Sequence, residues 1–369
     1  MNKIYYTAIF LVLSKISLSQ KITYNYLVDT SNVEVKKVKE LFENYIHSRP
    51  DSIYNNPYWS DSEKISGRHF DILYGEFQPS LYMGFPVHVL SIKSNNHVYE
   101  IKAMFSSCES DGTPYVLTIV NFYAKKEIEN YKLYNALFIN RKRWLTNKIG
   151  LVSFYSPLYH KFDSAKAKKM SDFAIELCKN LELEPVPFEY YLAGDFDELQ
   201  NIKGIDYWLG MGGEVKPTGR GGNGSVFCSG MGENYFHEPF HVLVGLKYKS
   251  HLWVAEGMAT YLGGSRGQPL SWHITRVNKY LKDNLEINLN NLLSLRTMDE
   301  YTDFRYVLGG LIAKRIFEKG GWKLIREFMN SGYSDEDYYN AIEKYLGIKR
   351  NDLNKYLRQE LEIEEKSKK

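Results

Sequence analysis

Two kinds of apolar pattern follow each other in the first third of the chain. Between Asn32 and His47, apolar residues recur at helical spacing, which predicts a surface helix. Three strand-like runs come next, separated by short Asn-Asn and Asp-Gly turns: Val87–Ser94, His97–Phe105 and Tyr115–Ala124. One helix followed by an antiparallel meander predicts a small α+β domain, which we place at residues 20–130.

The second part of the chain, residues 149–369, has a different pattern. It opens with a predicted strand, an amphipathic helix, another strand and the start of a short helix: Leu151–Pro157, Ser164–Leu183, Pro187–Gly194 and Asp195–Ile202. The glycine-rich stretch Gly219–Ser225 lacks the Lys-Ser/Thr ending of a phosphate loop, so we interpret it as a flexible turn before a strand. From Asn234 onward the pattern is mostly helical, so we expect an α+β fold with a helical C-terminal half.

The N-terminus is typical of a secretory signal peptide. A basic residue, Lys3, precedes the apolar run Ile4–Leu13, and the small residues Ser17 and Ser19 follow. Cleavage after Ser19 would remove residues 1–19; the alternative is a buried N-terminal helix. The apolar run is too short to span a bilayer, and no later segment is apolar enough. We therefore expect a secreted or periplasmic protein without an integral membrane segment.

Composition narrows the class of function only slightly. A hydrophobic fraction of 44% in 369 residues supports a sizeable core, and a net charge of +3 gives no electrostatic reason to expect a nucleic-acid partner. The three cysteines, Cys108, Cys178 and Cys228, are too few and too scattered for a disulfide framework, although one disulfide could form.

The strongest chemical signal is the stretch "FHEPFHV", which begins at Phe236. His237 and His241 are four residues apart, so on a helix their imidazoles project from one face and can reach one tetrahedral ion at about 2.0 Å each. Glu238 would lie beside the metal-bound water and act as general base. A catalytic zinc needs a third protein ligand, and Glu256 on the next predicted helix is the candidate. The plain alternative is two ordinary histidines on a helix.

Other histidines fit the metal site less well. A third histidine of the metzincin type would require glycine and histidine where this chain has Val244 and Lys247, so we interpret His251 as a loop residue. We expect His160 and His273 to be ordinary surface or half-buried histidines.

The stretches "HEPFHVLVG" and "LWVAEGMATYLGG" together resemble the gluzincin metallopeptidases of clan MA, and in particular the peptidase-MA-like group. The second helix of that group carries a Trp-Leu-x-Glu-Gly-x-Ala-x-Tyr pattern, filled here by Trp253, Glu256, Gly257, Ala259 and Tyr261. The resemblance covers roughly residues 151–360 and implies a thermolysin-like gluzincin domain at 149–369. The N-terminal domain resembles NTF2-like or cystatin-like modules, at the level of pattern only.

The same resemblance assigns roles to the site residues. It implies that His237, His241 and Glu256 bind Zn²⁺ and that Glu238 is the base. Gluzincins often place a tyrosine or histidine where it stabilises the oxyanion, and the stretch that begins at Tyr301 resembles the helix involved. Our first choice is Tyr306 and our second is Tyr301; the alternative is a plain core tyrosine.

Three departures from the family pattern bear on the site. Pro239 is acceptable only if the helix begins within a turn before it, so we predict a helix whose first turn lies near His237. The segment Met231–Asn234, "MGEN", superficially resembles an exopeptidase motif of the aminopeptidase branch, but its order and position differ and we do not assign that activity. Some gluzincins support a ligand histidine with an aspartate where this chain has Thr260.

The sequence therefore predicts a zinc-dependent peptidase acting on a peptide or protein substrate, with a metal-activated water and Glu238 as base. One alternative is a non-catalytic binding protein that retains the peptidase fold, in which the N-terminal domain recruits a partner or a glycan. A second alternative is that the protein hydrolyses a non-peptide amide with zinc.

Overall fold

The computed structural model describes residues 21–48, 56–65, 85–208, 219–245, 247–295 and 297–367. The predicted signal peptide lies outside these residues. Among the helices of the described residues, none combines the length and the apolar character needed to cross a lipid bilayer. The chain forms two compact units, each of which is described by itself.

The two units do not follow the contiguous ranges expected from the sequence. The first comprises residues up to Arg143 together with Gln200–Glu214, and the second comprises the rest of the chain. The chain returns to the first unit because strand β9 (Ile205–Trp208) pairs antiparallel with strand β4 (Pro114–Glu127). A pairing between segments so far apart leaves no mark in the local apolar pattern, which is why the sequence did not predict it.

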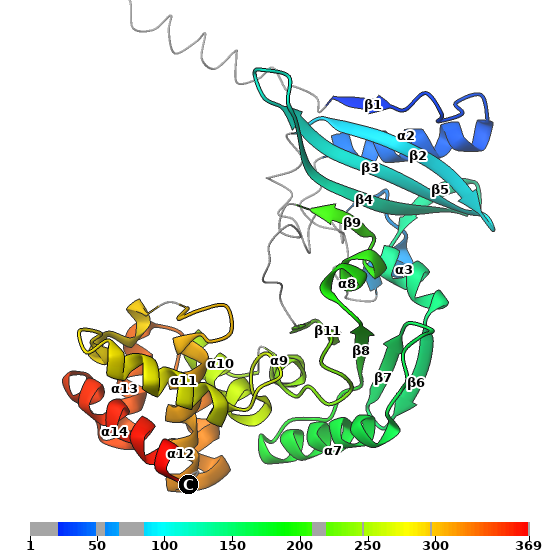
Figure 1. The fold of residues 1–369 in the computed structure, drawn as a ribbon. Coiled ribbons are helices and arrows are strands. Elements are labelled where there is room, and N and C mark those ends of the chain that lie inside the picture. The colour runs from blue at the N-terminus through cyan, green and yellow to red at the C-terminus, as the bar shows by residue number, and fades with distance from the viewer. Residues whose placement is uncertain are drawn as a thin grey trace, which may run out of the picture. The chain divides into compact units, whose positions relative to one another are not determined.

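The first unit contains a sheet with strand order β1-β2-β3-β4-β5, with β9 beside β4 (Figure 1). The other strands are β1 (Ile22–Tyr24), β2 (Val87–Asn95), β3 (Val98–Cys108) and β5 (Asn130–Tyr134). The helical segments are α2 (Val33–His47), α3 (Asp61–Ile65), α6 (Ala136–Asn140) and the 3-10 turn Arg141–Arg143. Helix α2 begins after Asn32, whose side chain accepts hydrogen bonds from the next turn's backbone N–H groups.

Helix α2 packs on one face of this sheet. Its Phe42 and Tyr45 meet Phe122 of β4 at ring-centroid distances of 5.2 and 5.9 Å. Three alternate residues in the middle of β3, Ile101, Ala103 and Phe105, are fully buried in the same core. The predicted helix and antiparallel meander are confirmed, whereas the NTF2-like or cystatin-like resemblance stays a prediction.

The second unit combines a five-stranded sheet with a set of helices. The strand order is β10-β11-β8-β7-β6, with β8 parallel to both β7 and β11. The strands are β6 (Leu145–Ile149), β7 (Val152–Ser156), β8 (Phe188–Ala193), β10 (Gly219–Gly222) and β11 (Ser225–Ser229). Helix α7 (Ser164–Asn180) shares a buried core with β7 and β8, and α8 (Phe196–Ile202) follows β8. The strands and helices predicted between Leu151 and Ile202 are confirmed.

The interpretation of Gly219–Ser225 as a flexible turn is wrong. Residues Gly219–Gly222 form β10, an edge strand paired antiparallel with β11. The reversal falls at Asn223 and Gly224, which have φ angles of +48° and +73°. Two consecutive positive φ angles at Asn-Gly fit the tight hairpin turns whose twist matches that of paired strands. The Asn-Gly pair was therefore the hairpin signal, and the flanking glycines concealed it.

The C-terminal half of the second unit is helical, as predicted. It contains α9 (His237–Val244), α10 (Leu252–Gly263), α11 (Leu270–Asp283), α12 (Phe304–Met329), α13 (Asp335–Leu346) and α14 (Leu353–Lys366), with 3-10 turns at Leu289–Ser294 and Arg350–Asp352. Helices α10 and α12 cross in close contact, because Gly257 and Gly309 face each other at the crossing. A Cβ atom on Gly257 would lie 2.6 Å from the carbonyl oxygen of Gly309.

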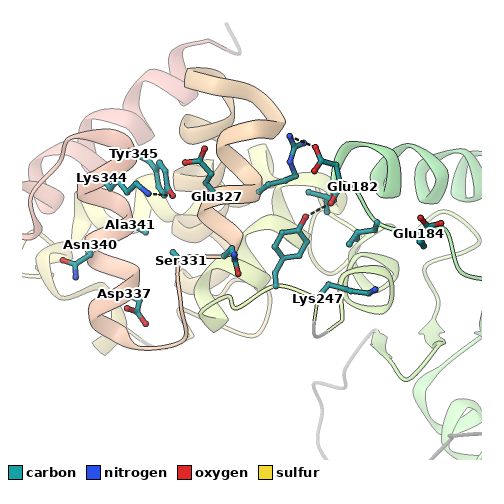
Figure 2. A pocket seen from close by; sticks show the side chains of 15 residues that line it. Glu182, Glu184, Lys247, Glu327, Ser331, Asp337, Asn340, Ala341, Lys344 and Tyr345 are labelled. Carbon is teal, nitrogen blue, oxygen red and sulfur yellow. Dashed lines mark hydrogen bonds and ion pairs between the residues drawn. The ribbon is translucent and has the colours of Figure 1, made fainter.

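A cavity of about 820 Å³ opens beside α13 in the second unit (Figure 2). Its lining carries charges of both signs: Arg326 pairs with Glu182 at 2.9 Å, and Lys344 donates to the Tyr345 hydroxyl at 3.0 Å. None of the lining residues belongs to the segment His237–His241 or is Glu256. The cavity is therefore separate from the candidate metal ligands.

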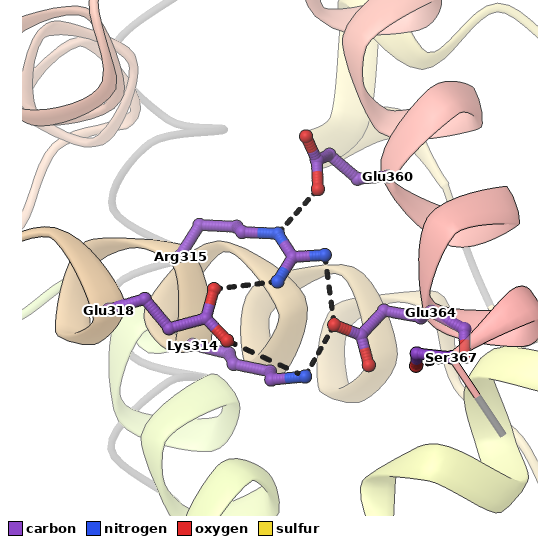
Figure 3. A network of polar contacts seen from close by, with 6 residues as sticks. All are labelled: Lys314, Arg315, Glu318, Glu360, Glu364 and Ser367. Carbon is purple, nitrogen blue, oxygen red and sulfur yellow. Dashed lines mark hydrogen bonds and ion pairs between the residues drawn. The ribbon is translucent and has the colours of Figure 1, made fainter.

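Helix α14 is tied to α12 by a group of ion pairs (Figure 3). The guanidinium of Arg315 contacts the carboxylates of Glu318, Glu360 and Glu364, and Lys314 also binds Glu364. Burial opposes the charge on Arg315, but the hydrogen bonds that it donates to Glu318 and Glu360 outweigh this effect and raise the pKa of the guanidinium. These contacts fix the C-terminal helix against the helix that carries Tyr306.

Replacing Arg315 by methionine is expected to lower the free energy of unfolding by about 1–3 kcal/mol, because the largely buried carboxylate of Glu360 loses its cationic partner and that of Glu364 keeps only Lys314. Urea unfolding followed by circular dichroism measures the change. Lys168→Met is the matched control: its pair with Asp172 is mostly exposed, and such pairs contribute about 0–1 kcal/mol. Equal effects of the two substitutions would contradict a role for this network in holding α14.

Candidate metal centre

Helix α9 begins close enough before Pro239 for the proline to lie in its first turn. The first helical residue is His237 and Pro239 is the third, after the N-cap residue Phe236. The first four N–H groups of a helix have no partner within it, so the missing N–H of Pro239 costs no hydrogen bond there. The backbone hydrogen bonds of the helix start with Phe240, whose N–H donates to the carbonyl of Phe236 at 3.3 Å. The prediction of a helix with its first turn near His237 is confirmed.

Three ligand atoms from α9 and α10 form a nearly regular triangle. The Nε2 atoms of His237 and His241 are 3.4 Å apart, and Oε2 of Glu256 lies 3.3 Å from the first and 3.4 Å from the second. A tetrahedral ion with ligands at about 2.0–2.1 Å separates them by about 3.3–3.4 Å. The spacing of the three atoms therefore matches three corners of such a tetrahedron.

The protonation of His237 is fixed by a backbone carbonyl. Its Nδ1 lies 2.7 Å from the carbonyl oxygen of Gly264, which can only accept, so Nδ1 carries the hydrogen. In the neutral ring Nε2 therefore presents a lone pair toward the carboxylate of Glu256, whereas in the protonated ring Nε2 donates a hydrogen bond to it. A proton can bridge one pair of these acceptor atoms at a time, whereas a divalent cation satisfies all three. The donor set thus fits zinc.

Two glycines at the end of α10 make this support of His237 possible. A Cβ atom on Gly263 would lie 2.6 Å from the carbonyl carbon of Phe236, so only glycine allows the end of α10 to approach the start of α9. Gly264 has φ +73°, in the left-handed region. Its carbonyl is the acceptor that holds Nδ1 of His237. The sequence did not reveal this partner, because a backbone carbonyl has no residue type of its own.

Charges within the triangle are strongly coupled. Burial opposes ionisation of Glu256, but the hydrogen bonds from His237 and His241 outweigh it and hold the pKa of the carboxyl below its usual range. Burial lowers the pKa of His237, but the hydrogen bond with Glu256 and the charge of Glu238 act against it, and the net shift is upward. The site therefore favours a negative carboxylate facing a positive charge.

Glu238 lies against the glycine strand β10. A Cβ atom on Gly219 would be 2.8 Å from Cγ of Glu238. A Cβ atom on Gly221 would be 3.0 Å from the backbone carbonyl carbon of Glu238. The backbone N–H of Gly221 also donates to the Glu238 carboxylate. Burial raises the pKa of this carboxyl, partly offset by the two histidines. The glycines that looked like a flexible turn thus allow a strand to pack directly on the predicted base.

Of the two candidate tyrosines, the structure brings Tyr306 to the site and not Tyr301. The Tyr306 ring lies 5.7 Å from the His237 ring, centroid to centroid. Burial, followed by the negative charge of Glu256, raises the pKa of Tyr306 to about 12, so its hydroxyl keeps its proton and can donate. Tyr301 is 53% exposed and packs against the guanidinium of Arg276. Sequence reasoning missed Tyr235, whose ring is stacked near that of His237 with an interplanar angle of 9°.

The remaining candidates have structural partners. His251 is the N-cap of α10, accepting from the backbone N–H of Trp253 at 3.2 Å. Glu233 of the "MGEN" segment is buried and accepts from Nε2 of His160 at 2.7 Å and from the backbone N–H of Asp163 at 2.9 Å. The expectation of a surface or half-buried His273 is wrong, since that ring is 1% exposed. All three cysteines are free.

Comparisons with known proteins give only distant likenesses. No protein-family model matches the chain, and no curated protein does. Among solved structures, a two-domain M1 zinc metallopeptidase mutant bound to L-arginine shares 12% identity with a TM-score of 0.33, over 76% of this chain and 63% of that one. An aminopeptidase N family protein from Idiomarina loihiensis shares 14% identity with a TM-score of 0.33, over 74% and 55%.

This chain thus spans less than two thirds of the length of either solved chain. Their names place both neighbours among M1 zinc metallopeptidases and the aminopeptidase N family, and neither names the peptidase-MA-like group. At a TM-score of 0.33, these likenesses add no argument to the geometry of the site.

Proposed function

We propose that the second unit is a zinc-dependent metallopeptidase domain of the gluzincin type. One observation carries the proposal: Nε2 of His237, Nε2 of His241 and Oε2 of Glu256 lie 3.3–3.4 Å from one another. Two imidazoles and one carboxylate, with a glutamate beside the first imidazole, are the donor set of thermolysin-type catalytic zinc sites. The match between spacing and donor type supports zinc over a chance cluster.

The proposed mechanism assigns one task to each residue around the triangle. His237, His241 and Glu256 would hold the ion, which when bound supplies Lewis acidity and lowers the pKa of water. Glu238 takes a proton from the attacking water and later gives it to the leaving amine; its raised pKa suits both transfers. The Tyr306 hydroxyl donates a hydrogen bond to the oxyanion that develops on the substrate carbonyl.

The edge strand β10 supports a peptide as the substrate class. In the described sheet β10 has a strand neighbour on one side, β11, and it packs on Glu238. An extended peptide can add to such an edge through backbone hydrogen bonds, which would bring a peptide carbonyl close to the base. Among the described residues, no comparable feature favours hydrolysis of a non-peptide amide.

The binding-protein alternative would be favoured if Pro239 distorted the helix that carries Glu238. Since α9 begins at His237, the proline is accommodated and that argument is lost. From the pattern of residues 1–19, we further propose that the protein is exported to a secreted or periplasmic location. We also propose that the first unit binds a partner or a glycan.

Metal analysis tests the proposal directly. The purified protein is expected to contain about one zinc per chain, and His241→Ala is expected to lose it, because two ligands cannot retain the ion. His251→Ala is the matched control: it removes a neighbouring histidine that caps α10 and should keep its zinc. Wild-type protein that stays metal-free after reconstitution with zinc would refute the proposal.

A further inference from the structure

His273 is a buried polar residue for which the mechanism above has no use. It lies on α11, and only 1% of its surface is exposed. Its Nε2 lies 2.9 Å from the carbonyl oxygen of Ser265, and its Nδ1 lies 3.2 Å from the hydroxyl of Thr302. A histidine buried with both ring nitrogens bonded is held in one orientation, and here it joins two segments that are far apart in the sequence.

The direction of every hydrogen bond in this chain of contacts is determined. The Ser265 carbonyl can only accept, so Nε2 carries the hydrogen and Nδ1 of the neutral ring accepts from the Thr302 hydroxyl. The same hydroxyl accepts from Nε of Arg276 at 3.0 Å, and Arg276 is itself paired with Asp299. Burial and the charge of Arg276 lower the pKa of His273, in agreement with a neutral ring.

Each end of this chain of bonds is next to a part of the proposed active site. Ser265 directly follows Gly264, whose carbonyl fixes the Nδ1 hydrogen of His237. Thr302 directly precedes Asp303, the N-cap of α12, in whose first turn Tyr306 lies. The His273 ring therefore spans from the turn that orients a ligand histidine to the start of the helix that carries the tyrosine.

We propose that His273 is a positioning residue that couples the metal ligand His237 to the oxyanion tyrosine Tyr306. It acts through Gly264 and Ser265 on one side and through Thr302 on the other. The proposal rests on the proposed function, because it assumes that these two residues work in one site.

Two substitutions separate the two ends of the link. Asparagine at 273 places its amide near the position of Nδ1, so His273→Asn keeps the bond with Thr302 and loses the one with Ser265. Glutamine reaches the position of Nε2, so His273→Gln keeps the donor to Ser265 and loses the acceptor for Thr302. Thr302→Val removes the hydroxyl that donates to Nδ1 of His273, together with the acceptor for Arg276, at nearly the same side-chain volume, and it stands in if His273→Gln fails to fold.

Zinc affinity, measured by competition with a chelator, is expected to fall on the order of ten-fold in His273→Asn, at the low end of the loss caused by removing an outer-shell partner. In His273→Gln, zinc affinity should stay near the wild-type value. In that variant kcat is expected to fall while KM is unchanged. Hydrogen exchange should increase at residues 264–268 in the first variant and at 302–306 in the second.

The matched control is Asn278→Ala on the same helix, which removes the hydrogen bond from the buried Asn278 amide to Glu365 and should change stability but neither zinc affinity nor exchange in those two segments. Wild-type protein that binds zinc, with both His273 variants unchanged in zinc affinity and exchange, would overturn this inference alone. Wild-type protein that binds no zinc would overturn the proposed function instead.

Discussion

Glu238→Gln is expected to lower the turnover of a peptide or casein-type substrate by about 10²–10⁴-fold, while zinc stays bound at one ion per chain. Glutamine has nearly the same shape as glutamate but cannot accept the water's proton. The three ligand atoms belong to other residues, so the substitution leaves the metal site intact. Turnover and zinc content measured on the same preparation separate the loss of the base from the loss of the ion.

Glu233→Gln is the control for this prediction. Glu233 is the other buried glutamate in the same stretch, and its carboxylate is already bonded to His160 and to the backbone of Asp163. A glutamine oxygen can still accept both bonds, so we expect near-normal turnover. Substantial turnover in Glu238→Gln would exclude Glu238 as the base, and a large loss in Glu233→Gln would assign a catalytic role to the "MGEN" segment.

Gly257→Ala is expected to reduce both stability and zinc affinity. The new methyl group would lie 2.6 Å from the Gly309 carbonyl oxygen, so α10 and α12 must move apart. Overpacking of this kind costs about 1–3 kcal/mol, and more when the obstacle is backbone that cannot rotate away. Glu256 is the preceding residue of α10, so the movement also displaces the carboxylate from the triangle.

Chemical unfolding and a zinc-competition titration measure the two effects of Gly257→Ala. Gly222→Ala serves as the matched control, because a Cβ atom there meets no other atom within 4 Å. If Gly257→Ala kept wild-type stability and zinc affinity, the close crossing of the two helices would not be what places Glu256.

The sequence indicated the residues that meet at the candidate metal centre better than those that hold them in place. His237, Glu238 and His241 were recognisable because their spacing has a direct meaning on a helix, and the late start of α9 followed from Pro239. The Gly264 carbonyl could not be predicted, since any residue type has one and its position depends on how α10 ends. The burial of His273 depends in turn on the packing of α11, which a single histidine in an amphipathic pattern does not reveal.

The fold shows the same division between local and long-range information. Helix α2 and strands β2 to β4 have clear periodic patterns, and the structure confirms them. Strand β10 was mistaken for a turn because glycine has no apolar side chain to report a strand. Two of its glycines, Gly219 and Gly221, are explained by Glu238, which lies where their side chains would be.

Strand β9 has a consequence for how the chain is made. The first unit's sheet is incomplete until residues 205–208 have been synthesised, which happens only after β6, β7, α7 and β8 of the second unit have been synthesised. Until then, β4 presents an unpaired edge where β9 will bind. A chain shortened to end at Arg143 would keep that edge permanently, and one beginning at Trp144 would carry β9 without its partner. Although each unit has its own core, the first unit therefore completes its sheet only after part of the second unit has been synthesised.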